Sequence, residues 1–79
     1  MIVNVYYRDE ETGSVRAGRA YSYRCSIPNV TVGMEVIAPT AKRDARAVIC
    51  EINVSKSRID KRILPLLKEI TKEAPADGK

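Results

Sequence analysis

Two groups of basic side chains are the residues of this sequence whose type and spacing most directly imply chemistry. The first group is Lys42, Arg43 and Arg46, and the second is Lys56, Arg58, Lys61 and Arg62. Clustered cations bind phosphate oxygens and release counterions, so that affinity depends on salt. The pattern predicts contact with a nucleic-acid backbone. The alternative is a solvated surface, with Asp44 pairing locally in the first group and long side chains shielding apolar edges in the second.

Tyrosines supply all of the aromatic content, because the chain has four Tyr and no Phe or Trp. The tyrosines are interleaved with Arg8 and Arg24, and exposed tyrosines in such a pattern can stack on unpaired bases. By strand parity Tyr7, Tyr21 and Tyr23 point toward the core, which has no other aromatic residue to fill it. Tyr6 is therefore the one stacking candidate, and Arg24 joins the predicted phosphate contacts.

The chain contains few residues in arrangements suited to catalysis. There is no histidine to activate any of the serines, and no metal-binding or phosphate-loop motif is present. We therefore expect no enzymatic activity, no cofactor and no metal site. Cys25 and Cys50 lack the spacing of a zinc site. They are interpreted as reduced core residues, with a Cys25–Cys50 disulfide as the alternative.

Four strands, each with one buried face, must position these residues. Period-2 alternation predicts strands over about residues 1–8 and 20–27, joined by the charged turn 9–13. A second pair is predicted over about 34–39 and 46–54, joined by a hairpin at 40–45. The expected inward residues of this second pair are Met34, Val36, Ala38, Val48, Cys50, Ile52 and Val54.

The C-terminal part shows apolar residues at helical spacing. Ile59, Ile63, Leu66, Leu67 and Ile70 predict an α-helix over about 60–73 that covers the sheet, with its regular part beginning near Pro65. Residues 1–74 are expected to form a single domain and residues 75–79 a flexible tail. No segment reaches transmembrane length and no signal peptide is recognisable, which predicts a cytoplasmic protein without membrane contact.

The central run V-G-M-E-V-I-A-P-T-A-K-R-D-A-R-A-V-I-C-E-I, with Y-S-Y-R-C before it and I-L-P-L-L-K-E-I after it, resembles short uncharacterised proteins of phages and mobile elements. It is also similar to the N-terminal DNA-binding domain of PriA-type primosomal helicases, where a V-G-D-x-V-x-V-P strand precedes a hairpin. Met34 stands where that pattern has an acidic residue. The resemblance implies a mainly β fold, a small SH3-like or open β-barrel of four to five strands with a C-terminal helix.

These observations predict a non-enzymatic nucleic-acid-associated accessory protein of a phage or mobile element. It would contact the phosphate backbone of DNA or RNA through the basic hairpin and the strand-to-helix link. The predicted contacts are Arg24, Lys42, Arg43, Arg46, Lys56, Arg58 and Arg62, with Tyr6 for stacking. The alternative is a protein-interaction module or a homo-oligomeric structural protein that associates through an exposed strand edge.

Overall fold

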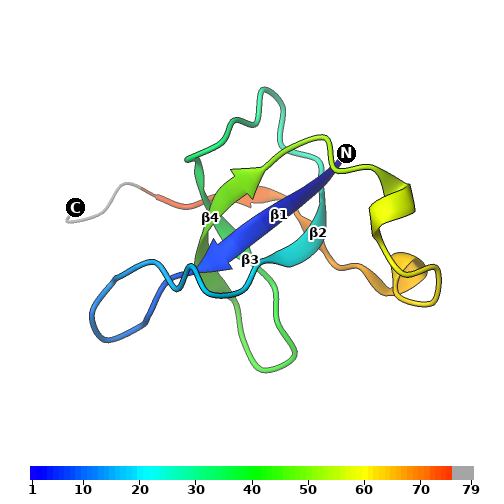
Figure 1. Ribbon diagram of the computed structural model, residues 1–79. Coiled ribbons are helices and arrows are strands. Elements are labelled where there is room, and N and C mark those ends of the chain that lie inside the picture. The colour runs from blue at the N-terminus through cyan, green and yellow to red at the C-terminus, as the bar shows by residue number, and fades with distance from the viewer. Residues whose placement is uncertain (76–79) are drawn as a thin grey trace.

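A single curved sheet of six strands forms the structure, a computed structural model that describes residues 1–75 (Figure 1). The strands are β1 (Ile2–Tyr7), β2 (Tyr21–Cys25), β3 (Glu35–Ala38), β4 (Ala45–Glu51), β5 (Glu69–Ile70) and β6 (Lys72–Glu73). Their order across the sheet is β5-β2-β1-β4-β3-β6. The prediction of a mainly β, barrel-like fold is confirmed, but the predicted number of four to five strands is wrong, because residues 69–73 add two short strands.

Two antiparallel hairpins build the central four strands. β1 pairs with β2 and β3 pairs with β4, as their alternation predicts, and β1 also pairs with β4 to join the two hairpins. The charged turn after β1 forms because the carboxylate of Asp9 accepts hydrogen bonds from the amides of Glu11 and Thr12, while Gly13 adopts φ +76°.

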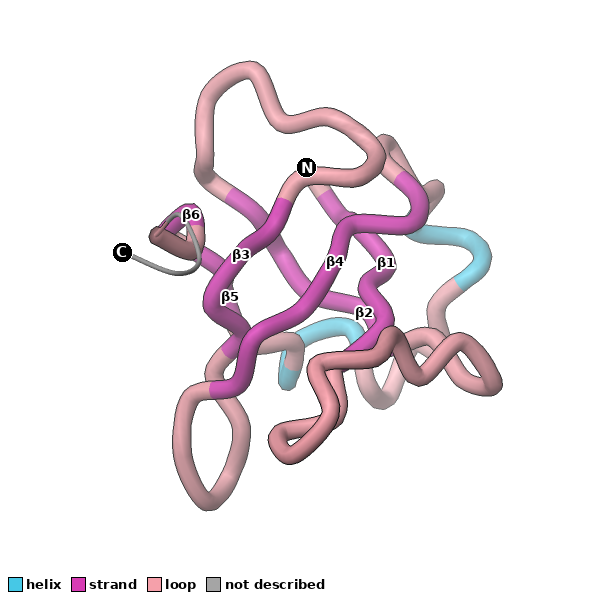
Figure 2. The backbone as a smooth tube through the Cα atoms, turned by 90° about the vertical axis from the view of Figure 1, so that its left-hand side faces the viewer, coloured by secondary structure: helices cyan, strands magenta, loops and turns pink. Residues whose placement is uncertain are grey.

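The chain between residues 69 and 73 nearly closes the sheet into a barrel. β5 lies parallel to β2, and β6, only one residue later, lies antiparallel to β3. Figure 2 shows this segment beside β3, where the two edges of the sheet approach each other. One extended segment therefore covers parts of both edges that the hairpins leave open.

The predicted C-terminal α-helix over about 60–73 is wrong. The chain forms two short 3₁₀ turns, η1 (Lys56–Arg58) and η2 (Leu64–Leu66), and then the strands β5 and β6. A helix of so few residues is marginal by itself, whereas the extended segment pairs its backbone with both sheet edges. The amide of Arg24 donates to the carbonyl of Lys68 at 2.9 Å, and the amide of Ala74 donates to the carbonyl of Glu35 at 2.9 Å.

The helical spacing of the apolar residues consequently does not mark one buried face. Ile70 is completely buried because β5 turns it into the barrel, whereas Leu66 on η2 is 73% exposed and Ile63 is 51% exposed. Pro65 lies in η2, where its missing amide hydrogen costs no regular helical bond.

The barrel interior is a single apolar core, as the alternation predicts. Its fully buried side chains include Val3, Val5, Val36, Ile49 and Ile70. The predicted inward face of β4 is only half right. Ala47 and Ile49 point inward in place of Val48 and Cys50, and a register shift in the β1–β4 pairing, between Asn4 and Val5, restores the predicted parity for Ile52 and Val54.

The cysteines are both free, so the alternative of a Cys25–Cys50 disulfide is wrong. Cys25 is buried in the core, as predicted, but Cys50 lies half-buried on the other side of the sheet, and burial raises the pKa of its thiol. Of the predicted tail 75–79, only Pro75 belongs to the described residues. Within residues 1–75, no helix is long and apolar enough to cross a membrane.

Candidate ligand-binding groove

A groove about 480 Å³ in volume opens beside β2, where the barrel is not fully closed. Its walls come from residues 19–23 in and before β2, residues 39–41 after β3, and the link 58–68 that carries η2. β5 pairs with β2 only at Arg24 and Cys25, so the edge of β2 before Arg24 faces this opening. We call it the tyrosine groove, because Tyr7, Tyr21 and Tyr23 line it.

A hydrogen-bonded pair of tyrosines forms part of the lining of the groove. The hydroxyl of Tyr23 donates to the carbonyl oxygen of Pro39 at 2.9 Å and is also hydrogen-bonded to the hydroxyl of Tyr7. Burial, and then the bond to Tyr7, raise the pKa of Tyr23. These bonds tie β1, β2 and the β3–β4 connection together, so this part of the groove is preformed.

Tyr21 differs from Tyr23 although both have the same strand parity. It is 37% exposed, so its prediction as a core residue is wrong. Its ring lies 4.6 Å from the Tyr7 ring between centroids, and the guanidinium carbon of Arg19 lies 5.2 Å from the centroid of Tyr21. The position at the start of β2, beside the opening in the barrel, explains its exposure.

Charge in the tyrosine groove is predominantly positive. Arg19, Arg58 and Lys68 line it, together with one acidic residue, Asp60. Asp60 is itself paired with Arg62 at 3.2 Å, and the hydrogen bonds from Arg62 lower the pKa of this carboxyl. The groove therefore combines aromatic and cationic side chains with little acidic charge inside it.

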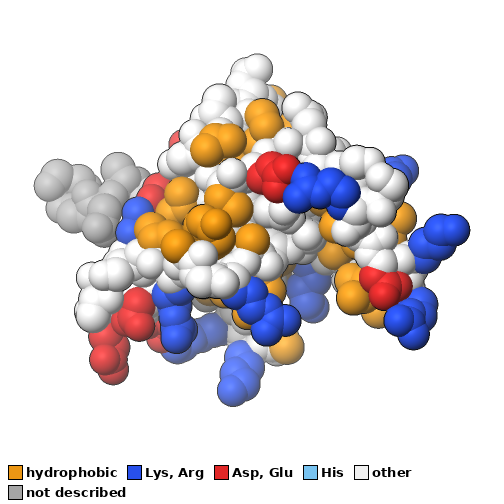
Figure 3. Space-filling model, in the orientation of Figure 1, with side chains coloured by type: hydrophobic (Ala, Val, Ile, Leu, Met, Phe, Trp, Pro, Cys, Tyr) orange, Lys and Arg blue, Asp and Glu red, His pale blue; other side chains and the backbone are white. Residues whose placement is uncertain are grey.

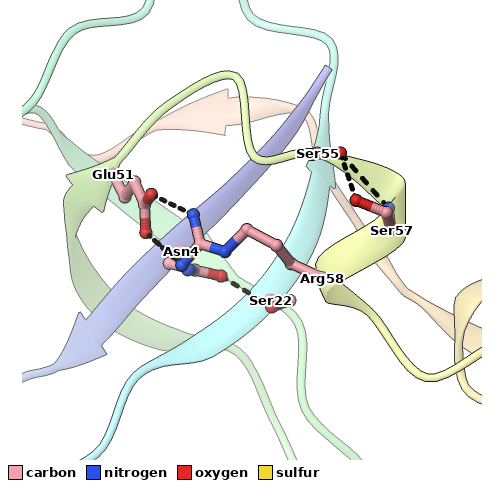
Figure 4. A network of polar contacts seen from close by, with 6 residues as sticks. All are labelled: Asn4, Ser22, Glu51, Ser55, Ser57 and Arg58. Atoms are coloured by element: carbon pink, nitrogen blue, oxygen red, sulfur yellow. Dashed lines mark hydrogen bonds and ion pairs between the residues drawn. The ribbon is translucent and has the colours of Figure 1, made fainter.

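A polar network on the outer face of the sheet holds one of these cations (Figure 4). Arg58 pairs with Glu51, which also accepts a hydrogen bond from the side-chain amide of Asn4 at 3.0 Å. The hydroxyl of Ser22 donates to the amide oxygen of Asn4 at 2.6 Å. The hydrogen bonds from Arg58 and then from Asn4 lower the pKa of Glu51. Three strands thus position the guanidinium at the groove wall.

A second and larger groove, of about 1060 Å³, lies beyond the β3–β4 connection. Six acidic residues and three arginines line it, and we call it the acidic groove. Two of the arginines are in ion pairs: Arg8 binds Glu35, with a 3.0 Å contact from its Nε, and Arg43 binds Glu10. Figure 3 shows acidic side chains over the loop after β1 and basic ones along the lower edge and around the 56–68 link.

The structure does not bring the sequence-predicted cations into one site. Only Arg58 lines the tyrosine groove, whereas Arg43 and Arg46 line the acidic groove, where Arg46 donates to the carbonyl of Pro75 at 3.0 Å. Arg24 donates to the carbonyl of Leu64 at 3.2 Å, tying β2 to η2.

The remaining predicted contacts lie at the surface. Arg62 forms the pair with Asp60, and Lys42 and Lys56 are exposed without an ion pair to any residue within 1–75. Tyr6 is half-buried on the outer side of β1, where it contacts Cys50. Sequence reasoning missed Arg19 and Lys68 as site residues, although the closeness of Arg19 and Tyr21 in the chain was a usable signal.

Among residues 1–75, no group of three or more His, Cys, Asp or Glu side chains lies close enough together to hold a metal ion. Comparison with known proteins adds no further constraint: no family model, curated protein or solved structure matches this chain.

Proposed function

We propose that this protein is a non-enzymatic nucleic-acid-associated accessory protein that binds a phosphate backbone along the tyrosine groove. The observation that supports this best is the excess of cations around that groove. Arg19 and Lys68 have no ion pair within the described residues, so binding a phosphate does not require breaking one. Arg58 is held at the same groove by its pair with Glu51, and its side chain is 55% exposed.

Lys42 extends this positive region at the rim. It follows Ala41, the last residue of the β3–β4 connection that lines the groove, and it is exposed. Phosphate contacts from exposed cations give binding that weakens with salt, by a slope of about −0.7 per contact on single strands. About three contacts would reduce affinity roughly 20-fold between about 50 and 200 mM salt.

Fluorescence anisotropy of a labelled mixed-sequence oligonucleotide at these two salt concentrations tests the proposal. The variant Arg19→Glu/Lys68→Glu should weaken binding at least about tenfold and reduce the salt slope by about 1.4. Lys72→Glu, in β6 away from the groove, is the matched control for the single reversal Lys68→Glu, which changes the net charge by the same amount, and it should leave affinity within about twofold. Equal losses in Lys68→Glu and Lys72→Glu would show that only net charge matters.

A protein-interaction function is the second candidate, and the apolar wall of the same groove favours it. Ile63 and Leu66 are exposed there beside the uncovered edge of β2, an arrangement that suits an extended peptide. Anisotropy without any oligonucleotide binding, together with a concentration-dependent increase in mass by light scattering, would favour this function.

A further inference from the structure

A recess of about 360 Å³ adjoins the tyrosine groove and has an unusual lining. Its residues are Tyr7, Arg16, Gly18, Arg19 and Tyr21. The lining contains two aromatic rings and two guanidinium groups and no acidic side chain. Gly18 has no side chain, and a Cβ added to it would meet nothing within 4 Å, so the recess is open at this point.

Aromatic and guanidinium surfaces already lie against each other in the recess. The rings of Tyr7 and Tyr21 are tilted by 34° at a centroid distance of 4.6 Å, and Arg19 lies over the ring of Tyr21. Tyr7 is anchored through its hydroxyl to Tyr23, while Tyr21 keeps more than a third of its surface exposed. The exposed part of this group is therefore a preformed stacking surface with a cation beside it.

We infer that this recess receives an unpaired nucleobase, stacked on Tyr21 and Arg19, so that the protein selects single strands over duplexes. The inference rests on the proposed function. Every base has a π-face that stacks on an aromatic ring or a guanidinium plane. A duplex keeps these faces inside its own stack and offers only phosphates to the rim. Arg16 is placed to bind the phosphate next to the inserted base.

The stacking contribution is expected to exceed the electrostatic difference between the two forms of DNA. Base–aromatic stacking accounts for a roughly 5- to 150-fold change in affinity per base on removal of the ring. A duplex has the higher charge density and would bind better if phosphate contacts alone decided affinity. The direction of the preference therefore separates stacking from simple charge attraction.

The test measures the affinity of the full chain for one short oligonucleotide, first alone and then annealed to its complement. A 2-aminopurine base in the strand reports stacking directly through quenching of its fluorescence. We expect single-strand binding at least about tenfold tighter than duplex binding. Tyr21→Leu should remove most of that preference and the quenching. Tyr21→Phe keeps the aromatic ring and should retain both.

Tyr6→Leu is the matched control, because Tyr6 lies on the outer side of β1, away from the recess. It should leave the preference unchanged, and amide spectra should show that each variant is folded. Salt-sensitive binding with no preference for single strands, or with no effect of Tyr21→Leu, would overturn the inference and leave the proposed function standing. Absence of binding to either form would overturn both.

Discussion

The two grooves of this barrel are built from the same connections but have opposite charge. Residues 39–41 of the β3–β4 connection line the tyrosine groove, and residues 43–46, at the other end of this connection and the start of β4, line the acidic groove. The segment from the end of β1 into β2 is divided in the same way, with residues 9–13 in the acidic groove and 19–23 in the tyrosine groove. Charge is therefore separated within a few residues of chain.

The difference between the grooves lies in how their charges are compensated. In the acidic groove Arg8 binds Glu35 of β3, and Arg43 of the β3–β4 connection binds Glu10 of the turn after β1, so both pairs connect separate parts of the chain. In the tyrosine groove, Arg19 contacts an aromatic ring and has no carboxylate partner among residues 1–75. Compensated charge serves the fold, whereas uncompensated charge beside an aromatic surface is available to a ligand.

Truncation of the buried side chain of Ile70, which lies between the two grooves, should have the largest effect on stability. Ile70 of β5 is completely buried, and the segment that contains it runs from Lys68 in one groove to Glu73 in the other. Ile70→Ala should lower the free energy of unfolding by about 2–5 kcal/mol, because it leaves a cavity in the core. Urea denaturation followed by circular dichroism measures this change.

Leu66→Ala is the control for this change, since Leu66 belongs to the same apolar spacing but is largely exposed. It should alter the free energy of unfolding by less than about 0.5 kcal/mol. Comparable losses in the two variants would contradict the closure of the barrel by β5 and β6.

Breaking the Arg8–Glu35 ion pair of the acidic groove should lower stability and leave ligand binding intact. Arg8 and Glu35 are each about one-third exposed, and Arg8 also binds the carbonyl of Gly13. Arg8→Met should cost about 1–2 kcal/mol of unfolding free energy and change oligonucleotide affinity less than about twofold. A large loss of affinity with unchanged stability would reverse the roles assigned to the two grooves.

Adding positive charge to the acidic groove should have a smaller effect, and this effect is on oligonucleotide affinity. Glu11→Lys/Asp44→Lys changes two exposed side chains of its lining. At physiological ionic strength the screening length is about 8 Å, so affinity should rise by less than about threefold. Anisotropy at this ionic strength provides the measurement, and a tenfold gain would mean that the nucleic acid extends across both grooves.

Acid pH should produce the smallest effect, at the wall of the tyrosine groove. Because Arg58 holds the pKa of Glu51 below its ordinary value of 4.5, this pair stabilises the fold above that pH. The stabilisation is lost as the pH falls from 4.5 through the lowered pKa. Urea denaturation across this range should show a smaller decline for Glu51→Gln than for the natural chain, and an equal decline would assign it to other carboxyls.

Much of the fold could be predicted from the sequence because alternation is a local property. Val3, Val5, Val36 and Ala38 follow it and are buried. The prediction of the inward residues of β4 failed because A-R-A-V-I-C-E-I allows two phases, and the shift in the pairing with β1 changes the phase within this run. Arg46 shares the phase of Val48 and Cys50, which indicated that this face is the outer one.

The C-terminal segment and the groove could not be predicted in this way. Whether residues 69–73 form a helix or strands depends on the unpaired edges of β2 and β3, which are distant in sequence. The exposure of Tyr21 depends equally on where β5 stops pairing with β2. The sequence showed where basic residues cluster along the chain. It did not show their ion-pair partners, such as Glu10 for Arg43, because these partners come from other elements.

A titration of the ¹⁵N-labelled protein with a single-stranded oligonucleotide, followed by amide chemical shifts, tests the central claim most directly. The account predicts that shifts concentrate at residues 16–23, 39–41 and 58–68, around the tyrosine groove. Residues 9–13 and 73–75 of the acidic groove should remain nearly unchanged. Shifts concentrated in the acidic groove, or no shifts at all, would contradict it.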